Sequence, residues 1–161
     1  MARGLASFRP SAMRMHFVQA PRGFTVIDDT YNANPASVRC AIDAASQHAG
    51  RRRVIAILGD MLELGDASAA GHAEVGEYAV QAGVWGLVTV GPLAALAARS
   101  AVRAGLDPRR CRACDDNASA ARAATEMASA GDVILVKGSR GMRMEQIVSA
   151  LAESPDDSGD R

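Results

Sequence analysis

The fold of this chain is decided by the stretch Val26-Ile27-Asp28-Asp29-Thr30-Tyr31-Asn32-Ala33-Asn34-Pro35. It opens with β-branched apolar residues, which are typical of the end of a buried strand. Asn34 suits a helix N-cap, because its side-chain oxygen can accept from a free backbone N–H, and Pro35 suits the first helical position. A strand, a loop and a helix are therefore predicted in this order. The loop carries more hydrogen-bonding side chains than a turn needs, so it indicates either a ligand site or only a polar capping loop.

The composition is that of one globular domain. The chain has 161 residues, 48% hydrophobic and 22% charged, which is enough to bury a core. Lys+Arg and Asp+Glu both number 18, and this balance argues against general binding of nucleic acid or of a membrane surface. No apolar run is long enough to insert into a membrane. Three cysteines favour a reducing cytoplasm over a disulfide framework.

Strand and helix patterns alternate along the chain. Apolar runs predict strands at 13–18, 24–27, 54–58, 87–90, 110–113 and 132–136, the first two forming a hairpin. Helical spacing predicts helices at 35–49, 68–82, 92–105, 116–130 and 144–151. The alternation predicts an α/β, three-layer Rossmann-like domain with a mostly parallel sheet, helices on both faces and a hairpin near the N-terminus. We expect residues 1–12 to be a lead-in, 13–152 the folded domain, and 153–161 a disordered tail.

The polar side chains suited to binding gather in the loops that leave the strands. These loops are 28–34, 59–65, 91–92 and 137–143, whereas 50–53, 83–85 and 131–132 enter strands. If these polar residues served only to solvate the loops, the loops at both edges of the sheet would carry them equally. In parallel sheets ligands bind beyond the carboxyl ends of the strands, so this asymmetry predicts a binding site there.

Three of these loops suggest different chemistry. Lys137-Gly138-Ser139-Arg140-Gly141 precedes a helix N-terminus and favours an anion, although the Gly-x-x-x-x-Gly-Lys-Ser/Thr order of a P-loop is not present. Asp60 can hold an amine or a metal-bound water, or can simply cap a helix or a turn, which is the commoner use. The loop after the second strand offers acceptors and an aromatic face suited to a ribose and base, from Asp29, Tyr31, Asn32 and Asn34.

Other polar features have structural interpretations. His72 lies on the apolar stripe of its helix and is predicted to be packed or to cap. The run Arg51-Arg52-Arg53 is predicted to be solvated. The Cys-x-x-Cys spacing of Cys111 and Cys114 has no second pair, so we interpret it as incidental.

Three motifs, in order, resemble one family. Residues 28–35, residues 58–65 (Leu58-Gly59-Asp60-Met61-Leu62-Glu63-Leu64-Gly65) and residues 136–145 look like the C-terminal domain of the Mur ligases. The similar branch adds D-alanyl-D-alanine to the UDP-N-acetylmuramoyl tripeptide. The similarity runs from about Leu5 to Leu151, and residues 8–15 resemble the junction with that family's central domain.

The resemblance implies an ATP-dependent amide ligase of peptidoglycan synthesis. In the family, ATP phosphorylates the tripeptide carboxylate and the dipeptide amine then attacks the acyl phosphate. By position, the implied nucleotide-binding residues are Asp29, Tyr31, Asn32, Asn34 and Pro35, and the implied substrate-binding residues are Asp60, Met61, Glu63, Lys137, Ser139 and Arg140. Lys137 or Arg140 would hold the dipeptide carboxylate, with Asp60 near the amine. No main catalytic residue or metal ligand is assigned to this domain.

The resemblance also implies missing parts. The intact enzyme needs an N-terminal domain for the UDP-sugar and a central domain with a glycine-rich ATP loop, and this sequence has the pattern of neither. ATP and Mg²⁺ are therefore expected to serve the intact enzyme and not to be held by this domain alone. The isolated domain is expected to fold without catalysing ligation. The alternative is a free-standing, non-catalytic module that binds a nucleotide or an anion through the same loops.

Overall fold

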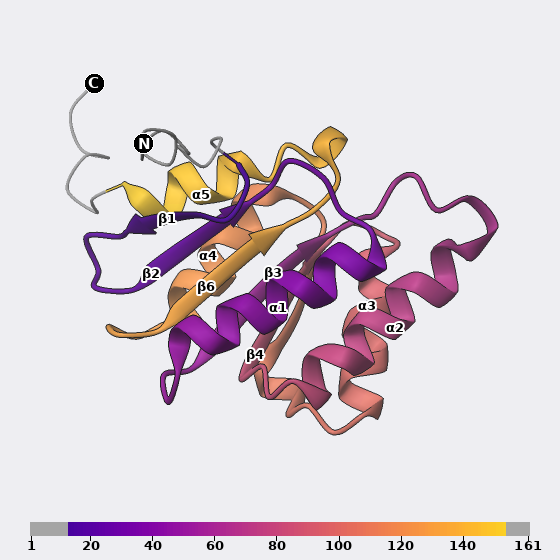
Figure 1. Ribbon diagram of the computed structural model, residues 1–161, viewed down its shortest axis with the longest axis horizontal. Coiled ribbons are helices and arrows are strands. Elements are labelled where there is room, and N and C mark those ends of the chain that lie inside the picture. Colours follow the sequence, from indigo (N-terminus) through magenta and orange to yellow (C-terminus); the bar gives the residue numbers. More distant parts are fainter. Residues whose placement is uncertain (1–12, 154–161) are drawn as a thin grey trace, which may run out of the picture.

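The computed structural model describes residues 13–153 (Figure 1). The expectations for the lead-in, 1–12, and for the tail beyond residue 153 lie outside the described residues. The strands are β1 (His16–Gln19), β2 (Thr25–Asp29), β3 (Val54–Gly59), β4 (Gly86–Val90), β5 (Cys111–Cys114) and β6 (Val133–Lys137). The helices are α1 (Pro35–Ala49), α2 (Ser68–Gln81), α3 (Ala94–Arg103), α4 (Asn117–Met127) and α5 (Glu145–Ala152), with short 3₁₀ turns η1 (Gly65–Ala67), η2 (Pro108–Arg110) and η3 (Arg140–Met142).

The strands form one sheet in the order β1-β2-β6-β3-β4-β5. The hairpin partner β1 is antiparallel to β2, and every other neighbouring pair is parallel. Helices α1, α2 and α3 cover one face and α4 and α5 the other (Figure 1). Successive residues of β6 serve opposite faces: Leu135 packs under the first group and Val136 under the second. The predicted three-layer α/β fold is confirmed.

Helix α1 begins and ends at the residues predicted from the sequence. Asn34 accepts the N–H of Ser37 at 2.8 Å through its side chain, and the Ser37 hydroxyl accepts the N–H of Asn34 at 3.0 Å. This reciprocal cap satisfies two backbone donors that the first turn cannot pair. The predicted inward residues Val38, Ala41, Ile42 and Ala45 are buried.

Replacing Asn34 with alanine is expected to lower the free energy of unfolding by about 1 kcal/mol, because the Ser37 N–H loses its acceptor. Urea denaturation of the chain measures this loss. Asn34→Asp keeps the acceptor oxygen and is the matched control, which should lose much less. Equal losses in both variants would show that the cap contributes nothing.

Several predicted boundaries differ from those observed, and two of the differences have identifiable reasons. The first strand starts at His16 and not at residue 13, because Met13 and Met15 have left-handed φ angles of 75° and 45° that cannot continue a strand. Helix α3 starts at Ala94 and not at Pro92, and the carboxylate of Asp60 accepts the Ala94 N–H there. A side chain from another segment therefore fixes where this helix begins.

The prediction of a solvated arginine run was wrong for Arg53. Its guanidinium makes two hydrogen bonds to the carboxylate of Asp132 and lies 3.9 Å from the ring centroid of Trp85. The hydrogen bond with Asp132 raises the pKa of Arg53. This cluster ties the start of β3 to the start of β6, at the sheet edge opposite the predicted binding loops.

Candidate functional site

The three predicted binding loops meet at one edge of the sheet. Strands β2, β6 and β3 are adjacent and parallel, so their carboxyl ends point the same way. In the strand register Asp29 is paired with Lys137, and Lys137 with Leu58. The expectation that residues near 30, 60 and 140 lie together is confirmed.

Lys137 is the buried centre of this edge. Its side chain is 4% exposed, and its Nζ donates to Asp29 Oδ2 at 2.6 Å and to the Asn32 carbonyl at 2.8 Å. Asp29 also accepts the backbone N–H of Met15 at 3.2 Å. Lys137 therefore holds the loop after β2, and its partner Asp29 holds the segment that precedes β1.

A hollow of about 600 Å³ opens beside this ion pair. Its polar lining includes Asp29, Asn32 and Asn34 together with Lys137. Tyr31 also lines it and is largely exposed. Of the predicted nucleotide-binding residues, Pro35 is absent from this lining; it is the first residue of α1.

Other residues that line the same hollow were not predicted from the sequence. The guanidinium of Arg14 lies 4.0 Å from the centroid of the Tyr31 ring, a cation–π geometry. Ser37 and Cys40 line it from α1. Arg14 lies within the junction motif at 8–15, which was the available signal for it, whereas Ser37 and Cys40 fit an ordinary helix pattern.

The predicted substrate-binding residues divide into buried and exposed groups. Asp60 is buried and its Oδ1 accepts the Ala94 N–H at 2.6 Å. This is the helix-capping role, which the sequence offered as the alternative to binding a ligand. Met61 is buried at 1% exposure and donates its N–H to Nε2 of His72 at 2.9 Å. The buried hydroxyl of Ser139 accepts the Leu62 N–H at 2.8 Å. These three side chains define the shape of the edge from inside.

Glu63 and Arg140 form the exposed group. The Arg140 side chain is 56% exposed, and its Nη1 lies 3.1 Å from Oε2 of Glu145. An exposed guanidinium can donate two parallel hydrogen bonds to a carboxylate or a phosphate. Lys137, in contrast, already donates to two oxygens.

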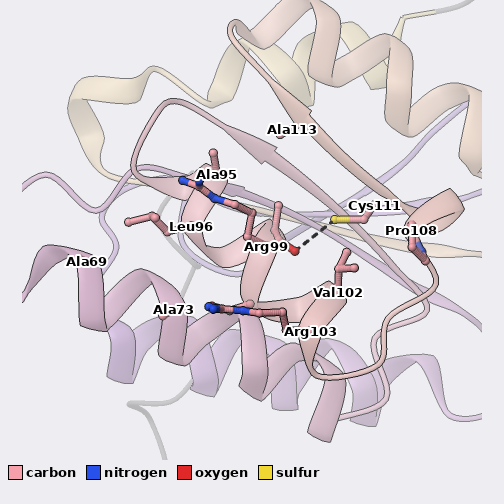
Figure 2. A pocket seen from close by; sticks show the side chains of 12 residues that line it. Ala69, Ala73, Ala95, Leu96, Arg99, Val102, Arg103, Pro108, Cys111 and Ala113 are labelled. Carbon is pink, nitrogen blue, oxygen red and sulfur yellow. Dashed lines mark hydrogen bonds between the residues drawn. The ribbon is translucent and has the colours of Figure 1, made fainter.

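A larger hollow of about 760 Å³ lies elsewhere, between α2, α3 and β5 (Figure 2). Small and apolar side chains such as Ala73, Leu96 and Val102 form most of its lining, with Arg99 and Arg103 beside them. None of the predicted site residues lines it. Because it offers few polar groups to orient a substrate, we assign the site to the smaller hollow at the carboxyl edge.

Cys111 and Cys114 do not form a joint site. They lie three residues apart on β5, and Cys111 packs with the core under α1–α3 while Cys114 packs with the core under α4 and α5. Burial raises the pKa of both thiols. Two protonated thiols on opposite faces of the sheet cannot bind one metal ion or form a disulfide with each other. The interpretation of this spacing as incidental is supported by the geometry.

Two further observations concern only residues 13–153. They contain no group of three or more His, Cys, Asp or Glu side chains placed to hold a metal ion. They also contain no helix with the length and apolar character that crossing a membrane requires.

The fold and the site define a class. A mostly parallel sheet with helices on both faces, which carries a buried lysine, acceptor side chains and an exposed aromatic ring at its carboxyl edge, is an α/β domain of the Rossmann-like kind. Residues 13–140 match the family model described as "Mur ligase, glutamate ligase domain". The chain belongs to the Mur ligase family, and it corresponds to the C-terminal domain that the three motifs indicated.

Curated relatives agree with this assignment. The chain is 36% identical over 154 residues to the UDP-N-acetylmuramoyl-tripeptide–D-alanyl-D-alanine ligase of Bacillus subtilis. This match covers 96% of this chain and 34% of that protein. It is 34% identical over 153 residues to the ligase of the same name from Escherichia coli, covering 94% of this chain and 32% of that protein. The chain thus spans about a third of the length of the curated relatives that it matches.

Solved structures give the same result. Crystal structure I of MurF from Acinetobacter baumannii has a TM-score of 0.77 at 29% identity, over 91% of this chain and 31% of that one. MurF from Thermotoga maritima, solved in complex with ADP, has a TM-score of 0.75 at 26% identity, over 92% of this chain and 32% of that one.

Proposed function

We propose that this chain is the C-terminal domain of an ATP-dependent amide ligase that adds D-alanyl-D-alanine to the UDP-N-acetylmuramoyl tripeptide, in the cytoplasmic stage of peptidoglycan synthesis. The relatives that share this domain carry that name. The observation on which the proposal rests is the carboxyl edge, where a loop suited to a nucleotide and a loop suited to an anion are joined by Lys137.

The nucleoside part of ATP fits the hollow beside Lys137. Its volume, about 600 Å³, is within the range of ligand pockets. The exposed Tyr31 ring offers a stacking surface, and Asp29, Asn32 and Asn34 offer acceptors for ribose and base. Lys137 contributes by fixing the loop that carries these groups.

The phosphates and Mg²⁺ are proposed to be held by the central domain. The loop after β6 lacks the order of a P-loop, and its cations are one buried lysine, Lys137, and two exposed arginines, Arg140 and Arg143. ATP supplies the phosphoryl group that activates the tripeptide carboxylate, whereas this domain closes the site and places the amine substrate.

For the incoming dipeptide, the structure favours Arg140 over Lys137 as the partner of its carboxylate. The Lys137 ammonium is buried with Asp29, while the Arg140 guanidinium is exposed on the same edge. Asp60 is buried under the N-terminus of α3, so it acts by shaping the loop 60–65, and Glu63 is that loop's exposed carboxylate. We therefore propose Arg140 and Glu63 as the dipeptide contacts, with Asp60, Met61 and Ser139 holding them in place.

The lone chain is expected to release no phosphate from ATP above background when tripeptide and dipeptide are both present. The reason is that one edge of the ligase site cannot position the phosphates by itself. A colorimetric phosphate assay measures this, with the full-length ligase containing the domain as the positive control. Phosphate release by the lone chain would contradict a division of the site between domains. A full-length protein that forms no amide bond would contradict the proposed activity itself.

Isothermal titration calorimetry separates this proposal from the free-standing module. The lone chain should bind ATP and ADP only weakly, because it contacts one side of the nucleotide. Micromolar affinity for either nucleotide, about −8 kcal/mol of binding free energy, would favour the module.

A further inference from the structure

Asn117, the first residue of α4, contacts the loop that follows β6. Its Nδ2, which carries two hydrogens, lies within hydrogen-bond distance of three acceptors: the carbonyl of Met142 at 3.0 Å, the carbonyl of Arg143 at 3.1 Å and Oε1 of Gln146 at 3.1 Å. The three acceptors are 25, 26 and 29 residues away in sequence. One amide group therefore ties the start of α4 to the turn between β6 and α5.

That turn has an irregular backbone that needs support. After the 3₁₀ turn η3, Arg143 takes a left-handed conformation with φ 52° and ψ 42°. For a residue with a side chain this conformation costs about 1 to 2 kcal/mol. The carbonyls of Met142 and Arg143 precede α5, and Asn117 supplies a donor to each of them.

The core holds the same turn from below. Met144 is fully buried against the ends of β3 and β6, where a Cβ added to Gly138 would lie 2.8 Å from Met144 Cγ. The turn is thus fixed on one side by Met144 and on the other by Asn117. Ser139 and Arg140 directly precede the supported residues, since Arg140 is the first residue of η3 and Ser139 is its N-cap.

We infer that Asn117 is a positioning residue for the amine substrate, and that it acts by holding the turn from which Arg140 meets the substrate's carboxylate. This inference rests on the proposed function. Asn117 is the first residue of α4, and it lies outside the three motifs and is not among the predicted site residues. In this role Asn117 contacts the turn and not the substrate, so it is a positioning residue and not a catalytic one.

Asn117→Asp is the informative substitution. It keeps the size and shape of the side chain but replaces the N–H donors with a carboxylate that faces three acceptor oxygens. A negative charge in the first turn favours a helix, so α4 itself should not be lost. The matched control is Ala118→Asp, which adds the same charge at the next, exposed position of α4.

Amide hydrogen exchange on this chain gives a readout that does not depend on ligase activity. The N–H of Met142 bonds to the Ser139 carbonyl at 2.9 Å, and that of Arg143 to the Arg140 carbonyl at 3.2 Å. In Asn117→Asp these two amides should exchange about tenfold faster, because hydrogen bonds that hold the turn are lost. In Ala118→Asp they should be unchanged. Unchanged exchange in both variants would overturn the inference.

Kinetics of the full-length ligase test the role in binding. The dipeptide carboxylate is remote from the reacting amine, so a misplaced Arg140 should weaken the binding of the substrate and of the transition state by the same amount. We therefore expect the KM for dipeptide to rise about tenfold, with kcat and the KM for ATP nearly unchanged. A fall in kcat without a change in the dipeptide KM would mark Asn117 as merely structural and contradict the inference. A parent enzyme that ligates no dipeptide contradicts the proposed function instead.

Discussion

Replacing Lys137 with methionine is expected to destabilise the chain by about 3 kcal/mol, near the lower end of the range for breaking a buried ion pair. The substitution leaves the Asp29 carboxylate, 14% exposed, without its cation, and it leaves the Asn32 carbonyl without its donor. The estimate stays at the lower end because Asp29 keeps some contact with water and its hydrogen bond from the Met15 N–H. Equilibrium urea denaturation at neutral pH measures the change.

The matched control for this experiment is Arg39→Met. Arg39 pairs with Glu74 at 2.8 Å between α1 and α2, but both side chains are close to half exposed. The same exchange of a cation for methionine should cost less than about 1 kcal/mol there, because exposed pairs contribute little. Equal losses in the two variants would mean that the Lys137 pair behaves as a surface pair.

A double substitution separates charge from packing. In Asp29→Asn/Lys137→Met the buried carboxylate charge is removed together with its partner, while the amide oxygen can still accept the Met15 N–H. We expect the double variant to be more stable than Lys137→Met by at least about 1 kcal/mol. If it is less stable, the unpaired charge is not the source of the loss.

Signals within a few residues of one another gave the most reliable predictions from sequence. Asn34 and Pro35 placed the start of α1 to the residue, because an N-cap is a contact between positions i and i+3. The boundary of β1 failed because the left-handed conformations of Met13 and Met15 have no counterpart in the hydrophobic pattern. Helix α3 was placed two residues early because its cap, Asp60, is 34 residues distant.

The location of the site followed from topology, whereas the roles of its residues did not. Parallel strands bring their exit loops to one edge, so a common edge was predictable. The contact of Lys137 with Asp29 spans 108 residues. From the sequence, Lys137 was predicted to be a substrate-binding residue, although its side chain lies with those that line the hollow proposed for the nucleotide. Which ligand each side chain contacts stays a prediction.

Replacing Gly76 with alanine should also strongly destabilise the chain, by about 2 kcal/mol or more. Gly76 lies in the middle of α2, where helix propensity alone predicts a gain of about 1 kcal/mol from the change. The structure reverses the sign of that prediction. A Cβ built at Gly76 would lie 2.7 Å from the carbonyl carbon and 2.8 Å from the Cα of Ala97, in addition to a clash with its carbonyl oxygen.

These atoms belong to the backbone of α3, so no side-chain rotation can relieve the overlap. The two helices must move apart, and the separation disturbs the packing of Val75 and Ala79 of α2 and Ala101 of α3, all of which are buried in one core. Overpacking costs about 1 to 3 kcal/mol and occasionally more. Overlap with backbone atoms belongs at the upper end, about 3 kcal/mol, so about 2 kcal/mol of destabilisation remains after the gain in propensity of about 1 kcal/mol.

Gly71→Ala, in the same helix, is the control. Its added Cβ would lie 2.8 Å from Cδ1 of Leu64, the end of a side chain that can rotate, and 3.1 Å from Cγ of Pro35. Its loss should therefore be clearly smaller than that of Gly76→Ala when both are measured by thermal and urea denaturation. A Gly76→Ala variant more stable than the parent would show that α2 and α3 do not cross this closely. A different position of α3 would also change the contact of its first turn with Asp60, a predicted site residue.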